Sequence, residues 1–179
     1  MDYKRLSKTV SYFLRHNPWQ IELEPDEAGW VPVDHLLAGI KSNFPQVTTA
    51  DLEMVIQISD KTRFEILGKK IRATYGHSIP RKIKKTPTEP PTVLYHGTTT
   101  KAVNSIMEVG LLPMDRQYVH LSLDIKTAKV IASRKGQKVA VIVVDAKSAF
   151  QDDTKFYEEL KGIWLADAIP SEYLNASFS

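Results

Sequence analysis

The chain of 179 residues contains no cysteine. It therefore has no disulfide, no thiolate nucleophile and no cysteine-based zinc or iron–sulfur site, and its composition suits a reducing compartment. It also lacks a long apolar run, and Asp2, Lys4, Arg5, Lys8 and Arg15 interrupt the stretch in which a signal peptide would be apolar. These absences predict a cytoplasmic protein without a membrane segment.

Common catalytic and metal-binding motifs are absent too. None of the patterns G-x-x-x-x-G-K-[ST], G-x-G-x-x-G, G-x-S-x-G and H-E-x-x-H occurs in the sequence. The five histidines include no pair four residues apart and form no carboxylate-rich cluster. We therefore expect no metal site.

The excess of positive charge lies in one short segment. The net charge is +3, and residues 1–79 and 92–179 each hold ten basic and ten acidic side chains. Residues 80–91 hold four basic side chains, one Glu and four prolines, which predicts an extended basic linker. This linker is either a solvated hinge or a cationic strap beside a polyanion such as nucleic acid.

Hydrophobic periodicity predicts an α+β chain whose first part is largely helical. In residues 1–79, Leu6, Val10, Phe13 and Leu14 have helical spacing, and this helix ends before Asn17. Further helices are expected over 34–41 and 49–59, extended stretches at 21–23 and 29–31, and a hairpin over 64–67 and 71–74. Three helices closed by a hairpin favour a winged-helix arrangement.

Residues 92–179 alternate short strands with helices. Strands are expected at 93–96, 118–121, 139–144 and 163–165, with helices over 101–109 and 124–134. Gly110 is suited to ending the first of these helices, and Asp124 to starting the second. The run from Val139 to Val144 is apolar throughout, which is typical of a strand buried on both faces.

Basic side chains stand at the ends of several expected elements. Arg15 and His16 close the first helix, Lys61 and Arg63 precede the hairpin, and Arg134 ends a helix of the second part. Alternation in an extended segment places Lys61 and Arg63 on one face, where their charges repel unless an anion binds. A phosphate is a suitable anion, and a solvated surface is the alternative interpretation.

Histidines supply a second set of candidates. Two expected strands end at His96 and His120, which indicates either a shared cleft or two buried histidines. The loop from Gly76 to Ser78 offers backbone N–H, imidazole and hydroxyl groups in consecutive positions. Taken alone, that loop is equally well explained as an anion contact or as an ordinary connection.

Six motifs, in this order, resemble the RNA 2′-phosphotransferase family and extend over nearly the whole chain. They are Leu14-Arg15-His16-x-Pro18, Asp60-Lys61-x-Arg63-Phe64, Ile71-Arg72-Ala73-x-x-Gly76-His77-Ser78, Leu94-Tyr95-His96-Gly97-Thr98, Tyr118-Val119-His120-Leu121-Ser122 and Ile163-Trp164-Leu165. The resemblance implies a winged-helix lobe over 1–79, a basic linker over 80–91 and an ADP-ribosyltransferase-like lobe over 92–179.

The resemblance also implies a reaction that consumes NAD⁺. An internal RNA 2′-phosphate attacks the ribose carbon that bears nicotinamide, and the ribose 2″-hydroxyl then attacks the phosphate. The products are nicotinamide, RNA with a free 2′-hydroxyl and ADP-ribose 1″,2″-cyclic phosphate. The expected context is RNA processing such as tRNA splicing, and the expected protein is a monomer.

Site residues follow from the same resemblance, which implies an active site between the lobes. The catalytic cations would be Arg15, Lys61, Arg63 and Arg134. The NAD⁺ site would comprise His96, Gly97, Thr98, His120, Leu121 and Ser122, and the RNA contacts would be His16, Gly76, His77 and Ser78.

The chain departs from related patterns at three positions. Ile163 or a neighbour stands where many ADP-ribosyltransferases place a Glu that helps activate a neutral acceptor. A phosphate acceptor is already charged and needs no general base for the first step. Within the family pattern, Tyr75 and Lys135 stand where Gln and His are expected.

Two other functions fit the same residues. One is a winged-helix nucleic-acid-binding protein without catalytic activity, in which His96 and His120 would be dispensable. The other is an ADP-ribosyltransferase that modifies terminal nucleic-acid phosphates. Both retain the basic cluster, so charge alone does not separate them.

Overall fold

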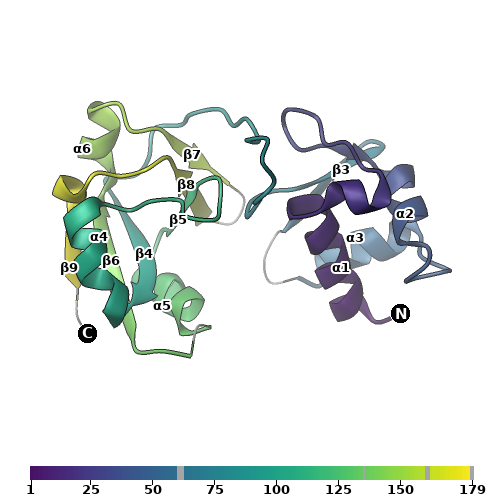
Figure 1. The fold of residues 1–179 in the computed structure, drawn as a ribbon, viewed down its shortest axis with the longest axis horizontal. Coiled ribbons are helices and arrows are strands. Elements are labelled where there is room, and N and C mark those ends of the chain that lie inside the picture. Colours follow the sequence, from purple (N-terminus) through teal and green to yellow (C-terminus); the bar gives the residue numbers. More distant parts are fainter. Residues whose placement is uncertain (60–62, 135, 160–161, 178–179) are drawn as a thin grey trace. The chain divides into compact units, whose positions relative to one another are not determined.

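The computed structural model describes residues 1–59, 63–134, 136–159 and 162–177 (Figure 1). The chain forms two compact units, Met1–Lys85 and Thr86–Ser179, each with its own hydrophobic core. Both contain helices and an antiparallel sheet, as the α+β prediction requires. Within the described ranges, every helix is too short or too polar to span a bilayer.

The first unit consists of three helices and a small sheet. Its elements are α1 (Tyr3–Arg15), the 3₁₀ helix η1 (Pro18–Ile21), β1 (Val31–Pro32), α2 (Val33–Ile40), α3 (Thr49–Gln57), β2 (Phe64–Leu67) and β3 (Lys70–Ala73). The strands pair antiparallel in the order β1-β3-β2, with Ile66 opposite Ile71. The three expected helices and the hairpin are confirmed.

The residues after α1 differ from the prediction. We expected an extended stretch at 21–23, but Pro18 starts η1 and Ile21 is its last residue. Proline at the first position of a helical turn has its backbone already set for that turn, which explains the difference. Glu22 ends η1 in the left-handed region, with φ of 55°.

Part of the predicted linker belongs to the first unit. Ile79 and Ile83 are 3% and 1% exposed, although they flank basic and proline-rich sequence. Lys84 forms an ion pair with Glu27 at 2.9 Å, and the Lys85 ammonium donates to the Thr74 carbonyl at 2.9 Å. Residues 80–85 are therefore packed on this unit.

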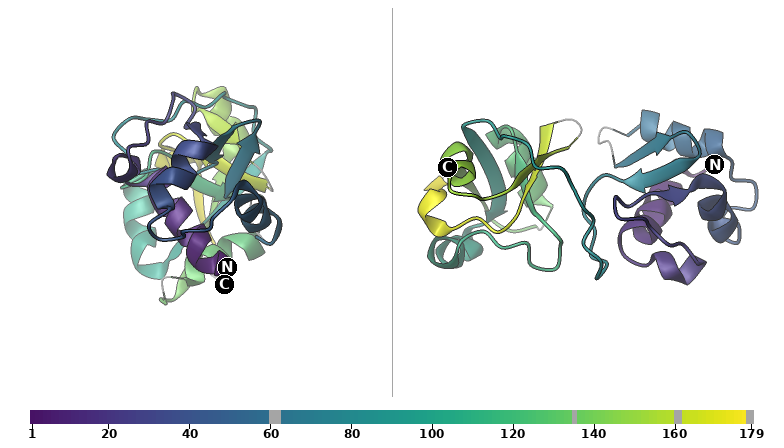
Figure 2. Two further views of the ribbon diagram at one scale, coloured as in Figure 1. Left: turned by 90° about the vertical axis from the view of Figure 1, so that its right-hand side faces the viewer. Right: turned by 90° about the horizontal axis from the view of Figure 1, so that it is seen from above.

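The second unit is built on a six-stranded antiparallel sheet in the order β7-β8-β5-β4-β6-β9. Figure 2 gives two further views of the ribbon. Its elements are β4 (Val93–Thr99), η2 (Thr100–Ala102), α4 (Val103–Val109), β5 (Val119–Ser122), α5 (Ile125–Ser133), β6 (Val139–Asp145), α6 (Ala146–Gln151), β7 (Phe156–Glu158), β8 (Ile163–Ala166), η4 (Ser171–Tyr173) and β9 (Leu174–Ser177). The elements α6, β7 and β9 were not predicted.

Helix-capping residues act as their sequence positions indicate. The Asp124 carboxylate accepts from the Thr127 N–H at 2.7 Å and starts α5. Gly110 ends α4 with φ of 89°, a conformation that L side chains rarely adopt. In the first unit, Thr48 and Asp51 form a capping box at the start of α3.

Gly97 permits a close approach between α5 and the sheet. A Cβ atom at this position would lie 2.0 Å from the Ala128 carbonyl oxygen and 3.2 Å from the Ala132 Cβ. Real Cβ atoms do not approach backbone so closely, so any side chain would force α5 away from β4. The backbone of α5 thus requires glycine at this point of the strand.

We expect Gly97→Ala to lower the free energy of unfolding by about 3 kcal/mol, at the upper end of overpacking costs. Gly68→Ala is the control, because Gly68 has φ of 58° and no atom within 4 Å of its Cβ position. That variant carries only backbone strain of about 1 kcal/mol. Urea unfolding of both variants measures the difference, and equal or smaller destabilisation in Gly97→Ala contradicts the packing argument.

Candidate functional site

The C-terminal end of α1 is joined to the loop that follows β3. The Ser78 N–H donates to the Arg15 carbonyl at 3.0 Å, and the Ser78 hydroxyl lies 2.8 Å from His16 Nδ1. His16 and Ser78 are both exposed. Two residues predicted to bind RNA, far apart in sequence, thus present their polar groups together.

The Arg15 side chain is held between this loop and the hairpin. Its guanidinium lies 5.0 Å from the Tyr75 ring centroid and 5.9 Å from that of Phe64, within the range of cation–π contact. Its Nη2 donates to the Arg63 carbonyl at 3.4 Å. Gly76 follows with φ of 85°, which a side chain would strain. Stacking therefore fixes the orientation of this cation.

Arg63 immediately precedes β2 and lies next to α1. Its Nη1 donates to the Ser7 hydroxyl at 3.4 Å, and Arg63 is half-buried. We refer to Arg15, His16, Arg63 and Ser78 as the α1-end cluster. Lys61, the fourth cation predicted for the site with Arg15, Arg63 and Arg134, lies outside the described residues.

His77 occupies a different environment from the α1-end cluster. Its side chain is 3% exposed, and burial, together with the charges of Lys85 and Arg15, lowers the pKa of His77 to about 3. Within the described structure its Nε2 has no hydrogen-bond partner. The imidazole is therefore neutral and internal, and the predicted RNA contact of the Gly76–Ser78 loop stays a prediction.

In the second unit, the two predicted histidine motifs lie on adjacent strands. Tyr95 of β4 is paired with Ser122 of β5, and His96 Nδ1 lies 2.8 Å from the carbonyl of His120. The side chains of His96 and His120 are partly exposed. The structure therefore places the two histidine motifs side by side.

The remaining members of that set are more enclosed. Leu121, Thr98 and Ser122 are 2%, 4% and 4% exposed, and Leu121 belongs to the hydrophobic core of the second unit. Gly97 has the packing role described above. His96 and His120 are the more exposed side chains of this set, although the Nε2 atom of His120 is buried.

Ile163 stands in the same row of the sheet. It is opposite Ser122 in the pairing of β5 with β8, and Ser122 is in turn opposite Tyr95. A carboxylate at position 163 would therefore lie beside the candidate cofactor residues. In its place the chain has an apolar side chain, so this row provides no general base.

Arg134 is the C-cap residue of α5 and is exposed. Residues close to Arg134 in the sequence line an open cavity of about 410 Å³. They are Lys129, Val130, Ser133, Lys138 and Val139. Among the described residues, no three His, Asp or Glu side chains gather as a metal site would require.

Comparison with known proteins assigns the family. Residues 2–168 match the family model described as RNA 2′-phosphotransferase, Tpt1/KptA family. The chain belongs to the RNA 2′-phosphotransferase family. This family consists of transferases, so the protein is an enzyme, and the predicted family resemblance is confirmed.

Relatives in several bacteria carry the same description, probable RNA 2′-phosphotransferase. One from Acetivibrio thermocellus is 48% identical over 97% of each chain. Another, from Bacillus thuringiensis, is 48% identical over 96% of this chain and 94% of its own. A third, from Streptomyces coelicolor, is 41% identical over 95% and 93%. The similarity thus includes both units of this RNA 2′-phosphotransferase family member.

Two features of the α1-end cluster were not predicted from sequence. Tyr75 departs from the family pattern, yet its ring stacks on Arg15. The Ser7 hydroxyl accepts a hydrogen bond from Arg63 Nη1. Ser7 was recognisable only as one of several polar residues at helical spacing along α1.

His77 makes the free energy of unfolding depend on pH. Because its pKa is about 3 in the folded chain and about 6.5 when unfolded, the unfolded state binds more protons between these values. The contribution of neutral His77 to stability is therefore full above pH 6.5 and declines by about 1.4 kcal/mol per pH unit as the pH falls.

We expect His77→Gln to remove this part of the pH dependence between pH 6.5 and 4, whatever its effect at neutral pH. His35→Gln is the matched control, since His35 is exposed on α2. Urea unfolding at a series of pH values compares the slopes of the three proteins. The same slope in His77→Gln and the wild type would rule out a buried neutral imidazole.

Proposed function

We propose that this enzyme removes an internal 2′-phosphate from RNA by transferring it to the ADP-ribose part of NAD⁺. The match over residues 2–168 to the RNA 2′-phosphotransferase family carries the proposal. The α1-end cluster supports it, because His16 and Arg63 line one groove, and Arg15 and Ser78 are hydrogen-bonded to these two residues. We further infer that residues 1–79 form a winged-helix lobe and residues 92–179 an ADP-ribosyltransferase-like lobe.

The first step needs a charged nucleophile and a good leaving group. A 2′-phosphate oxygen forms a bond to the ribose carbon while the bond from that carbon to nicotinamide breaks. The phosphate is already an anion, so the absence of a carboxylate at Ile163 suits this acceptor. Arg15 and Arg63 orient the phosphate, and Tyr75 limits the movement of Arg15.

NAD⁺ fits the polar groups of β4 and β5. His96 and His120 are partly exposed on neighbouring strands, and imidazoles offer the donors and acceptors that amide and ribose hydroxyl groups require. When bound, NAD⁺ supplies an electrophilic ribose carbon and the leaving nicotinamide. Gly97, Thr98, Leu121 and Ser122 complete this proposed binding site.

The second step returns the RNA hydroxyl. The ribose 2″-hydroxyl loses its proton as its oxygen forms a bond to phosphorus, and the bond from phosphorus to the RNA 2′-oxygen breaks. That oxygen takes a proton, giving RNA with a free 2′-hydroxyl and ADP-ribose 1″,2″-cyclic phosphate. Negative charge accumulates on the phosphate oxygens, which Arg15, Lys61, Arg63 and Arg134 would stabilise.

We expect Arg63→Ala and Arg134→Ala each to lower kcat/KM at least about 100-fold, the usual loss when one preorganised donor is removed. The assay follows a short RNA with one internal 2′-phosphate, with and without NAD⁺, and identifies all products by mass.

Activity is expected to persist in EDTA, because the phosphate nucleophile needs no metal to activate it.

The controls are Lys41→Ala in the first unit and Lys147→Ala in the second, both of which remove an exposed cation elsewhere. They are expected to retain activity close to the wild type. Loss of phosphate without NAD⁺ would overturn the proposed reaction. Accumulation of a stable ADP-ribosyl adduct would restrict the enzyme to the first step, and modification of terminal phosphates alone would assign a different acceptor.

A further inference from the structure

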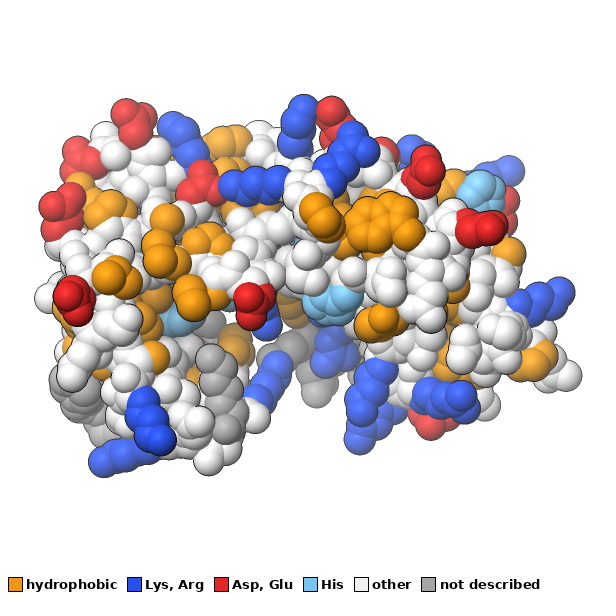
Figure 3. Space-filling model, in the orientation of Figure 1, with side chains coloured by type: hydrophobic (Ala, Val, Ile, Leu, Met, Phe, Trp, Pro, Cys, Tyr) orange, Lys and Arg blue, Asp and Glu red, His pale blue; other side chains and the backbone are white. Residues whose placement is uncertain are grey.

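A groove of about 380 Å³ extends along α1, beyond the α1-end cluster. Every residue that lines it carries a hydrogen-bond donor: Lys4, Ser7, Lys8, Ser11, Tyr12, His16 and Arg63. No carboxylate is among them. Figure 3 shows basic side chains gathered on the first unit in the region of α1. The groove is therefore suited to an anionic ligand.

The groove is continuous with the proposed site for the 2′-phosphate. His16 and Arg63 line it and also belong to the α1-end cluster. From His16 toward Lys4, the lining residues recur nearly twice per turn, at positions 16, 12, 11, 8, 7 and 4. At 1.5 Å per residue this path is about 18 Å long, enough for several consecutive groups of an extended ligand.

The cations in the first turn of α1 work against the stability of the helix. Lys4 and Arg5 lie in the first turn, where the helix dipole disfavours cations, and the helix contains no acidic residue. Within the described structure, Lys4 and Lys8 are exposed and form no ion pair. The Asp2 carboxylate caps the helix and Arg15 in the last turn suits the dipole, whereas Lys4 and Lys8 gain no such contact among the described residues. Exposed charges that do not stabilise their own helix are expected at positions that serve binding.

We propose that this groove binds the backbone phosphates of the RNA strand next to the 2′-phosphorylated nucleotide, an inference that rests on the proposed function. Lys4 and Lys8 pair with successive phosphates, while the hydroxyls of Ser7 and Ser11 donate to phosphate oxygens. The exposed ring of Tyr12 offers a surface for one base. Recognition of this kind depends on strand length and not on base sequence.

Strand length gives the first test. Two substrates are compared, a dinucleotide with a 2′-phosphate and an eight-nucleotide RNA with the same group at an internal position. The wild type is expected to favour the longer RNA in kcat/KM. In the double variant Lys4→Gln/Lys8→Gln, this preference is expected to fall about tenfold, since two phosphate contacts are lost.

Salt dependence gives a second, independent readout without NAD⁺. Each lysine that neutralises a phosphate adds about 0.7 to the slope of log K against log salt for single strands. Binding of the eight-nucleotide RNA by the double variant is therefore expected to show a slope shallower by about 1.4. Because Lys4 opposes the helix dipole in the first turn and Lys8 forms no ion pair within the described structure, the variant is expected to unfold at the same or a slightly higher temperature.

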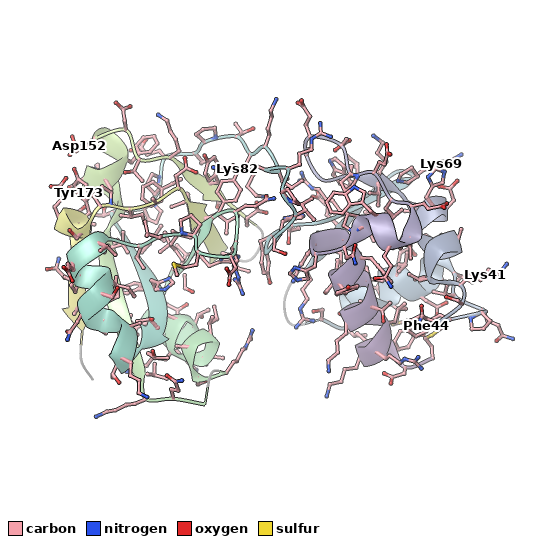
Figure 4. The ribbon with its side chains drawn as sticks, in the orientation of Figure 1. Lys41, Phe44, Lys69, Lys82, Asp152 and Tyr173 are labelled. Carbon is pink, nitrogen blue, oxygen red and sulfur yellow. The ribbon has the colours of Figure 1, made fainter. Side chains whose placement is uncertain are left out.

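The matched control is Lys41→Gln/Lys69→Gln, which removes the same charge from exposed positions of the same unit (Figure 4). It is expected to keep the length preference and the salt slope. Equal behaviour of the two double variants would overturn the groove proposal. Failure of the wild type to act on either RNA would instead refute the proposed function, and a salt slope altered only in Lys4→Gln/Lys8→Gln would still support the groove.

Discussion

The attachment of the loop after β3 to the end of α1 is the constraint on which the candidate phosphate site depends. Strand β3 lies at the centre of its sheet and packs against α1, so the chain leaves the sheet close to the helix. The Thr74 N–H donates to the Arg63 carbonyl at 3.1 Å, and Ser78 then bonds to Arg15 and His16. These bonds act together with those from Arg15 to the Arg63 carbonyl and from Arg63 to Ser7, and they hold the cations of α1 and of the hairpin in one geometry. The neutral, buried His77 fills the interior beneath this loop.

In the second unit, strand pairing brings the candidate site residues together. Because β4 and β5 are neighbours, the two histidine motifs come together without any contact between distant loops. Gly97 lets α5 lie directly on β4, and Arg134 caps that helix. The position of Arg134 thus depends on the packing of Gly97, which lies 37 residues earlier in the sequence, so fold and proposed chemistry are coupled.

Local signals in the sequence were sufficient for much of the fold. The periodicity of α1, the hairpin and the capping by Asp124 and Gly110 all depend on neighbouring residues. Elements that depend on distant pairing were missed, including β9, a four-residue strand at the sheet edge. Ile83 was assigned to a linker because its neighbours are basic, whereas its burial depends on residues such as Gly29. The candidate site residues were inferred from the order of the motifs, whereas the stacking of Tyr75 and the groove along α1 require three-dimensional placement.

The central claim is that the α1-end cluster binds the phosphate that is removed. A crystal structure of the full chain with a dinucleotide bearing a 2′-phosphate, in the absence of NAD⁺, tests this most directly. The account requires the 2′-phosphate to lie within hydrogen-bond distance of Arg15 or Arg63 and of His16 or Ser78. Electron density that places the 2′-phosphate away from these four side chains would contradict it.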